Sequence, residues 1–306
     1  MQAVTNRFIR LFFAVAAIVS SSPALADYAF LLINDPALPI FTEVFGINNA
    51  GQVAGIGLTS FIYDSKKGGY TRIADAPGSL GSSVLGINEP GVMVGALSFD
   101  GLTESAFVRS KNGAYTAFSH PGCTDTEARA INNTGLVTGH AFGCSPSDTV
   151  GFIYDPARNV FIDILPGEFT IAQGISNSGQ VVGSVALDAG IACTGCPRSN
   201  YGFLRAASGA ITLFRVNGHS TTARGITDSG LVTGSTASKG YVTSLAGLPY
   251  EAITIPDAEL LVFPGATSTS PEGISNAGDI VGIWSDAPSG GFPLHGFIAT
   301  PLPPKK

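Results

Sequence analysis

The sequence predicts an all-β protein, specifically a six-bladed β-propeller built from four-stranded antiparallel blades. Two observations support this prediction: a ten-residue box recurs six times, and short aromatic and β-branched segments follow each box. The composition agrees, because 39 Gly, 19 Pro and only 12% charged residues favour turns and strands over helices. A hydrophobic fraction of 44% excludes a disordered polar chain.

The repeated box has the pattern of a β-hairpin. An apolar residue precedes Asn, Ser or Thr, two turn-prone residues lead to an unvarying Gly, and apolar residues follow it. This Gly occupies the position where a type I turn with a bulge requires a positive φ, which Gly adopts at little cost. Each box therefore predicts two strands. The boxes span residues 46–55, 86–95, 130–139, 174–183, 225–234 and 273–282.

Two more strands are expected after each box. The third segment of each unit starts with an aromatic residue, at Phe61, Phe107, Phe152, Phe203, Tyr241 and Phe297. The fourth segment starts at Tyr70, Tyr115, Phe161, Ile211 and Tyr250. The sixth unit lacks it, and the segment 28–33 before the first box supplies it. One unit is thus split between the two ends of the sequence. This predicts a ring closed by the N-terminal strand, which completes the last blade, rather than an open solenoid.

Residues 1–26 have the features of a secretory signal peptide. Arg7 and Arg10 precede the apolar run 11–20, and Ala24-Leu25-Ala26 forms a small-x-small cleavage site before Asp27. The apolar run is shorter than the ~20 residues that a membrane span needs. We therefore expect cleavage between Ala26 and Asp27, export to the periplasm or the medium, and a single six-repeat domain over 27–303. No membrane span is expected in the mature chain.

The alternation of the GIN-x-x-G-x-V-x-G box with a small-aromatic-apolar triplet resembles the bacterial extracellular HAF-repeat family, which is named for a His-Ala-Phe triplet. The triplet is closest at Ser105-Ala106-Phe107 and at His295-Gly296-Phe297, and elsewhere it drifts to Gly-Phe or Gly-Tyr. The resemblance covers roughly residues 28–300. It implies an exported repeat protein and brings no catalytic residues with it.

The connections between the predicted strands differ in how much they vary. The box has ten residues in all six copies, and 8 or 9 residues separate the starts of the third and fourth strands. The other two connections vary from 6 to 20 and from 13 to 23 residues. In an antiparallel blade these variable loops share one face, here called the variable-loop face. Because rigid scaffolds carry function on variable loops, we expect the ligand there, at the channel mouth. The alternative is that long loops are merely tolerated on this face.

Candidate binding residues on this face precede the boxes, near the start of each innermost strand. Of these residues, Arg129, Arg224 and Glu272 are charged. They are placed either to bind a polar or anionic ligand or to form a structural ion pair. Trp284, the single Trp, lies in a predicted long loop, where it serves either for carbohydrate stacking or for packing. The full set before the boxes is Phe45, Leu85, Arg129, Gln173, Arg224 and Glu272.

The four Cys predict disulfides, because their number is even and the expected compartment is oxidising. Cys123 and Cys144 fall in loops of the same blade and the same face, whereas Cys193 and Cys196 form a C-x-x-C that staples one loop locally. An alternative is a zinc site, since His120, Cys123, His140 and Cys144 have the spacing of four ligands. Disulfides are favoured over zinc in that compartment, and no cofactor is predicted.

Two functions remain open. The first is an exported, non-catalytic binding or surface-interaction module, whose ligand is a glycan or a protein of the extracellular space or periplasm. The second is a propeller hydrolase or lyase that acts on polysaccharide at the channel mouth, with Glu272, Arg129 and Arg224 as candidates. Acidic and Arg side chains that converge within ~5–10 Å at the channel would favour the enzyme. A channel filled by apolar side chains would favour the binding module. The net charge of −6 disfavours a nucleic-acid partner.

Overall fold

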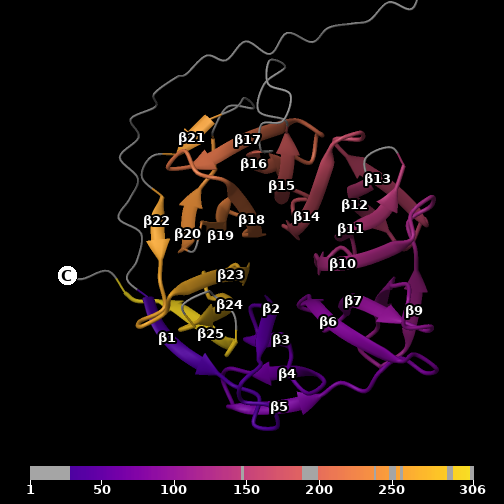
Figure 1. The fold of residues 1–306 in the computed structure, drawn as a ribbon, viewed down its shortest axis with the longest axis horizontal. Helices are drawn as coiled ribbons and strands as arrows, with labels where there is room; N and C mark the ends of the chain where they lie inside the picture. The colour runs from indigo at the N-terminus through magenta and orange to yellow at the C-terminus, as the bar shows by residue number, and fades with distance from the viewer. Residues whose placement is uncertain are drawn as a thin grey trace, which may run out of the picture.

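The computed structural model describes residues 28–145, 148–187, 199–237, 239–247, 253–255, 258–287 and 292–303. These residues form six sheets, which are arranged as blades around a central axis (Figure 1). The innermost strands, labelled β2, β6, β10, β14, β18 and β23, surround that axis. This confirms the predicted six-bladed propeller.

Within each blade the strands follow one another outward in chain order, except in the last blade. Blade 1 contains β2 (Glu43–Ile47), β3 (Gln52–Ile56), β4 (Ser60–Asp64) and β5 (Gly69–Arg72). Blade 2 contains β6 (Gly81–Ile87), β7 (Met93–Ser98), β8 (Ser105–Arg109) and β9 (Tyr115–Phe118). Blade 3 contains β10 (Asp125–Ile131), β11 (Val137–Cys144), β12 (Asp148–Asp155) and β13 (Val160–Ile164).

Blades 4 and 5 keep the chain order, and blade 6 is completed by the N-terminal strand. Blade 4 contains β14 (Phe169–Ile175), β15 (Val181–Leu187), β16 (Ser199–Arg205), β17 (Ile211–Val216) and the added β21 (Ile253–Ile255). Blade 5 contains β18 (Thr221–Ile226), β19 (Leu231–Thr236), β20 (Lys239–Ser244) and β22 (Glu259–Leu261). Blade 6 contains β23 (Ser268–Ile274), β24 (Ile280–Ser285), β25 (His295–Pro301) and β1 (Tyr28–Ile33).

The N-terminal strand closes the ring as predicted. Strand β1 pairs antiparallel with β25, in a register that runs from Tyr28 opposite Pro301 to Ile33 opposite Gly296. In Figure 1 the indigo β1 lies beside the yellow C-terminal strands. The last blade is therefore built from both ends of the described chain, so any opening of the ring must break this pairing.

The predicted position of the outer strand of blade 5 is wrong. We expected it to start at Tyr250, but β22 pairs with β20 instead, with Leu260 opposite Tyr241. Residues 248–252 lie outside the described part of the chain, and Ile253 belongs to β21, which pairs in parallel with β17 of blade 4. This β-branched segment pairs with the free edge of the neighbouring blade and covers it. An edge strand has unpaired backbone N–H and C=O groups, which favour such pairing. Sequence pattern alone does not distinguish these two edges.

The boxes form the predicted hairpins. In the first box the N–H of Gly51 donates to the carbonyl oxygen of Asn48 at 3.0 Å, and Gly51 has a φ of 81°. The equivalent Gly of the other five boxes also has positive φ, from 81° to 90°. The last Gly of each box lies opposite the aromatic residue of the third strand, which is fully buried in all six blades. A Cβ on Gly55 would lie 2.6 Å from the ring of Phe61, so the ring requires Gly there.

Hydrogen bonds between the hairpin tips form a second closed ring, on the face opposite the variable loops. The backbone N–H of the fourth box residue donates to the side chain of the equivalent residue in the next blade. The last of these bonds, from Asn276 N–H to Asn49 Oδ1 at 2.8 Å, joins blade 6 to blade 1. The donors in order are Asn49, Glu89, Asn133, Asn177, Asp228 and Asn276.

An ion pair with a buried carboxylate fastens the closing strand to blade 1. Asp35, just after β1, is fully buried and accepts hydrogen bonds from both terminal nitrogens of Arg72 on β5. It also accepts the backbone N–H groups of Ala37 and Leu58, each at 2.9 Å. The hydrogen bonds from Arg72 lower the pKa of Asp35 to about 2, although burial opposes the shift.

Replacing Asp35 by Asn is expected to make the protein less stable at neutral pH and less sensitive to acid. The folded pKa of about 2 lies below the ordinary 3.8, so the ion pair stabilises the fold above about pH 4, and this contribution is lost as the pH falls towards 2. We expect a loss of about 2 kcal/mol at neutral pH, measured by urea unfolding between pH 2 and 7. Asp64→Asn, which breaks an ion pair with exposed Lys67, is the control and should change little. Parallel stability curves for the parent and Asp35→Asn would contradict this role.

Candidate functional site: the channel mouth

Every innermost strand has a β-bulge at the same position, and that position is the one before the box. In β2, for example, Val44 pairs with Gly55 and Gly46 with Ala54, so Phe45 is left unpaired. A bulge turns its extra side chain away from the regular alternation of the strand. Five of the six bulge residues line a cavity of about 90 Å³ on the variable-loop side of the channel: Phe45, Arg129, Gln173, Arg224 and Glu272.

The charged bulge residues meet at this mouth, but each is already paired. Arg224 Nη1 lies 2.5 Å from Glu272 Oε2, and Ser270 Oγ donates to the other oxygen of Glu272 at 2.8 Å. These contacts link β18 and β23, two neighbouring innermost strands. The structure therefore brings together the predicted residues Arg224 and Glu272 and joins them in an ion pair between blades.

Arg129 is held by three different groups. Its Nη1 donates to Glu127 Oε1 and its Nε to Gln173 Oε1, both at 2.9 Å. Its guanidinium carbon also lies 5.5 Å from the centre of the Phe45 ring, within the range of a cation–π contact. The planar guanidinium thus spans the channel mouth from blade 3 towards blades 1 and 4.

Sequence reasoning missed two further acids at the mouth, Glu43 and Glu127. Each lies two residues before a bulge residue on its innermost strand, so strand periodicity was the signal that could have found them. Burial raises the pKa of Glu43, and the nearby charge of Glu272 adds to this rise while Arg129 opposes it. Glu43 therefore holds its proton more tightly than an ordinary carboxyl group.

His140 lies deep beside the same group of charges. It is 5% exposed, and its Nε2 lies 3.9 Å from Glu127 Oε1. Burial, with a further contribution from Arg129, lowers the pKa of His140 to about 3. Its Nδ1 has no hydrogen-bond partner among the described residues. At neutral pH this imidazole is uncharged.

A ring of six isoleucines lines the channel below the mouth. These residues, the second of each box, line both the mouth cavity and a separate cavity of about 70 Å³ at the hairpin side. The mouth is therefore a polar cup with an apolar floor. The ring consists of Ile47, Ile87, Ile131, Ile175, Ile226 and Ile274.

Trp284 is part of the packing of blade 6. It lies in β24, where its ring stacks on Phe263 at 4.3 Å and on His295 at 4.6 Å between centroids. Both faces of the indole are covered, so Trp284 is not placed to stack on a sugar. It is left out of the ligand contacts proposed below.

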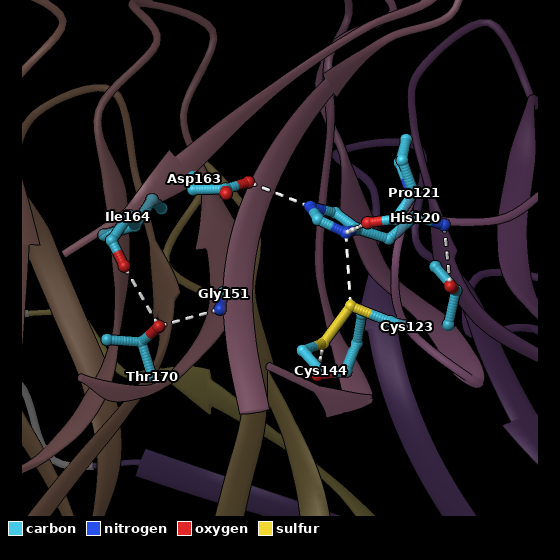
Figure 2. Close-up of polar contacts among 10 residues, drawn as sticks. His120, Pro121, Cys123, Cys144, Gly151, Asp163, Ile164 and Thr170 are labelled. Atoms are coloured by element: carbon cyan, nitrogen blue, oxygen red, sulfur yellow. Dashed lines mark hydrogen bonds and ion pairs between the residues drawn. A yellow bond between two sulfur atoms is a disulfide. The ribbon is translucent and has the colours of Figure 1, made fainter. Parts of the chain in front are cut away.

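Cys123 and Cys144 form a disulfide, as Figure 2 shows. This bond uses both sulfurs that the alternative zinc site requires. The two histidines of that alternative contact other groups: His120 Nε2 lies 2.9 Å from Asp163 Oδ1, and His140 lies near Glu127. Cys193 and Cys196 lie outside the described residues. In the described ranges, no group of three His, Cys, Asp or Glu residues is arranged to hold a metal ion.

A larger cavity, of about 390 Å³, lies away from the channel, between blades 3 and 4. Its walls include Leu136, Ile153, Val160 and Ile162, and Arg158 lies at its rim. Sequence reasoning missed this groove, because it depends on how two unlike repeats pack together. Its Arg158, which is exposed and pairs with Asp155, is a charged site remote from the channel mouth.

No helix in the described ranges is long and apolar enough to cross a membrane. No protein-family model matches the chain, and no curated protein matches it in sequence. Several solved structures share the fold. A virginiamycin B lyase from Staphylococcus aureus, solved with quinupristin as a catalytically inactive variant, is 11% identical, with a TM-score of 0.51 over 90% of this chain and 100% of that one.

Two further structures show the same architecture. A putative gluconolactonase is 14% identical, with a TM-score of 0.51 over 92% of this chain and 96% of that one. TolB from Acinetobacter baumannii is 13% identical, with a TM-score of 0.52 over 72% of this chain, and the match spans only 57% of TolB. At such low identity the likeness establishes the β-propeller fold and nothing about activity.

Proposed function

We propose that this chain is an exported binding module whose polar ligand, a glycan or a protein segment, occupies the cup at the channel mouth. One observation carries the proposal: every innermost strand has its bulge at the residue before the box, and five of these six residues line the cup. Polar side chains gathered above an apolar floor suit a ligand that docks end-on. The variable-loop face surrounds this cup, as expected for a binding surface on a rigid scaffold.

Export is part of this proposal. Its support is the sequence of residues 1–26, which lie outside the described part of the chain, and the resemblance to the HAF-repeat family. The Cys123–Cys144 disulfide is consistent with an oxidising compartment. N-terminal sequencing of protein from the periplasm and the medium would test it, and a mature N-terminus at Asp27 is the expected result.

The alternative is a hydrolase or lyase acting on polysaccharide at the same cup. One observation favours it: Glu43 has a raised pKa while nearby Glu272 is paired with Arg224, so the two carboxyl groups have unlike environments. Two carboxyl groups whose environments differ are the basis of acid–base catalysis on glycosidic bonds. The existing ion pairs and the small cup argue for binding instead.

Neutralising the cup is expected to weaken glycan binding about tenfold or more, because charge-assisted hydrogen bonds to the ligand are lost. The variant is Arg224→Gln with Glu272→Gln, titrated calorimetrically against neutral and acidic oligosaccharides. Arg158→Gln, in the groove between blades 3 and 4, is the matched control and should bind like the parent.

The enzyme alternative has its own test. New reducing ends or unsaturated sugars that appear with the parent and disappear in Glu43→Gln would support the enzyme. Ligand protection concentrated on the hairpin tips would place the working surface on the opposite face.

A further inference from the structure

The loop before each innermost strand contains the same four-residue turn. In every blade the N–H of the fourth residue donates to the carbonyl oxygen of the first, at 3.0 to 3.4 Å. Only the turn before blade 3 has a His at its first position and a Cys at its fourth, namely His120 and Cys123. Gly122 supplies the positive φ that such a turn needs after Pro121. The six turns run from Asp35 to Leu38, Ala76 to Ser79, His120 to Cys123, Leu165 to Glu168, Val216 to His219 and Phe263 to Ala266.

The turn brings the imidazole of His120 against sulfur. Its Nδ1 lies 3.2 Å from Cys123 Sγ, and its Nε2 lies 2.9 Å from Asp163 Oδ1 on β13. Figure 2 shows this line of contacts from the disulfide through His120 to Asp163. The ring is held in place, because it is 9% exposed and packs on Phe161 at 4.8 Å between centroids. A cysteine sulfur, an imidazole and a carboxylate in this order form the arrangement that activates thiol nucleophiles.

Blade 1 shows which part of this arrangement belongs to the scaffold. There Asp35 starts the equivalent turn, and it pairs with Arg72 at the position that Asp163 occupies in blade 3. Both strand residues lie opposite the buried aromatic of the third strand, Arg72 opposite Phe61 and Asp163 opposite Phe152. The ion pair is therefore a repeated structural feature. The sulfur beside the imidazole is specific to blade 3.

Both ring nitrogens of His120 face hydrogen-bond acceptors. Nδ1 lies 3.0 Å from the carbonyl oxygen of Pro121, and Nε2 faces the Asp163 carboxylate. These two contacts orient the ring and keep Nδ1 beside Cys123 Sγ. Once the disulfide is reduced, Nδ1 at 3.2 Å from Cys123 Sγ is placed to take the thiol proton and to stabilise the resulting thiolate.

We propose that Cys123–Cys144 is a thiol–disulfide exchange centre, in which Cys123 is the attacking thiolate, Cys144 the resolving cysteine, His120 a catalytic residue and Asp163 a positioning residue. The exposure of the two cysteines agrees with these roles, because Cys123 is partly exposed to solvent whereas Cys144 is 9% exposed. The partner is a disulfide or dithiol of a protein or a small molecule. This inference is independent of ligand binding at the channel mouth.

In the reducing direction the Cys123 thiolate attacks one sulfur of the partner disulfide. The partner S–S bond breaks, a mixed disulfide with Cys123 forms, and the first leaving thiolate takes the proton of the His120 imidazolium. The Cys144 sulfur then attacks Cys123 Sγ and expels the second partner thiolate, which takes up the proton that Cys144 loses. The partner gains two electrons and two protons, and the cysteine pair is oxidised to its disulfide. A partner dithiol drives the same steps in reverse.

The test uses full-length protein in which Cys193 and Cys196 are replaced by Ser. After reduction, iodoacetamide at neutral pH should modify Cys123 before Cys144, and about tenfold faster than it does in His120→Asn. The thiolate absorbance of the reduced protein should fall in His120→Asn as well. At a fixed ratio of reduced to oxidised glutathione, both His120→Asn and Asp163→Asn should contain less reduced protein than the parent. His219→Asn, an exposed His at the end of the equivalent turn of blade 5, is the control and should behave like the parent.

Equal alkylation rates in the parent and in folded His120→Asn would overturn the proposal. If His120→Asn does not fold, the parent protein still provides the test. The alkylation rate of reduced Cys123 in the folded parent is then compared with its rate in the parent unfolded in urea. Folded Cys123 that reacts more slowly than unfolded Cys123 would show a purely structural disulfide, and the proposal would be wrong.

Discussion

Deletion of residues 27–35 is expected to abolish cooperative unfolding. The deletion removes β1, whose register with β25 covers six residue pairs from Tyr28 to Ile33, and it also removes Asp35. Without β1, β25 becomes an unpaired edge, and blade 6 loses the only strand that the N-terminal segment contributes to it among the described residues. The expected result is a broad, non-cooperative transition, measured by circular dichroism during heating and in urea.

Point variants in β1 separate the effect of closure from that of shortening the chain. Ile33 is 0% exposed and packs with Val44 and Phe61 of blade 1 and Ile298 of blade 6. Ile33→Ala should therefore cost about 2–5 kcal/mol. Leu31, which is 46% exposed, is the control, and Leu31→Ala should stay within about 0.5 kcal/mol. A truncated protein that melts like the full chain would show that β1 does not hold the ring closed.

Removal of the Cys123–Cys144 disulfide is expected to cost about 3 kcal/mol, because the bond closes a loop with a sequence separation of 21 and so restricts the unfolded chain. The loss should be similar for the double Ser variant and for the parent after reduction, measured by urea unfolding. The folded structure should persist, since the core of blade 3 keeps Val137, Phe152 and its other buried members. This cost is compatible with reversible exchange, because we expect the reduced protein to remain folded.

Mass analysis of exported protein without reduction provides the matching chemical measurement. If Cys193 and Cys196 also pair, as their spacing predicts, the chain should weigh four hydrogens less than its fully reduced form. Four free thiols together with stoichiometric zinc would overturn the disulfide and favour the site of His120, Cys123, His140 and Cys144.

Local pattern was enough to predict most of the fold. The six boxes predicted the hairpins, because a Gly with positive φ and flanking apolar residues determine a turn within a few positions. The split repeat predicted the pairing of 28–33 with the last unit, since an incomplete blade needs a fourth strand. The prediction at Tyr250 failed because the β-branched segment could pair with the outer edge of either blade 4 or blade 5. Tertiary packing places it on blade 4.

The candidate site was predictable only in part. Arg129, Arg224 and Glu272 were found because they share one position in a repeat, and equivalent positions of a ring come together at its axis. Their pairing was not predictable, because it depends on which unlike side chains face each other between blades. Strand periodicity could have found Glu43 and Glu127, because each lies two residues before a bulge residue. The contact of His120 with Asp163, 43 residues away, depends on packing in the same way as the pairing.

The repeats are therefore sufficient to predict the number of blades, the closure of the ring, the hairpin turns and the face that carries the long loops. All of these follow from properties that repeat along the chain: apolar periodicity, glycine at positions of positive φ, and loop length. Three features depend on tertiary packing: the charged bulge residues meet at one cup, isoleucines form its floor, and an imidazole lies against the disulfide. These features arise where different repeats meet, and contacts between non-identical surfaces are set by three-dimensional packing rather than by local pattern.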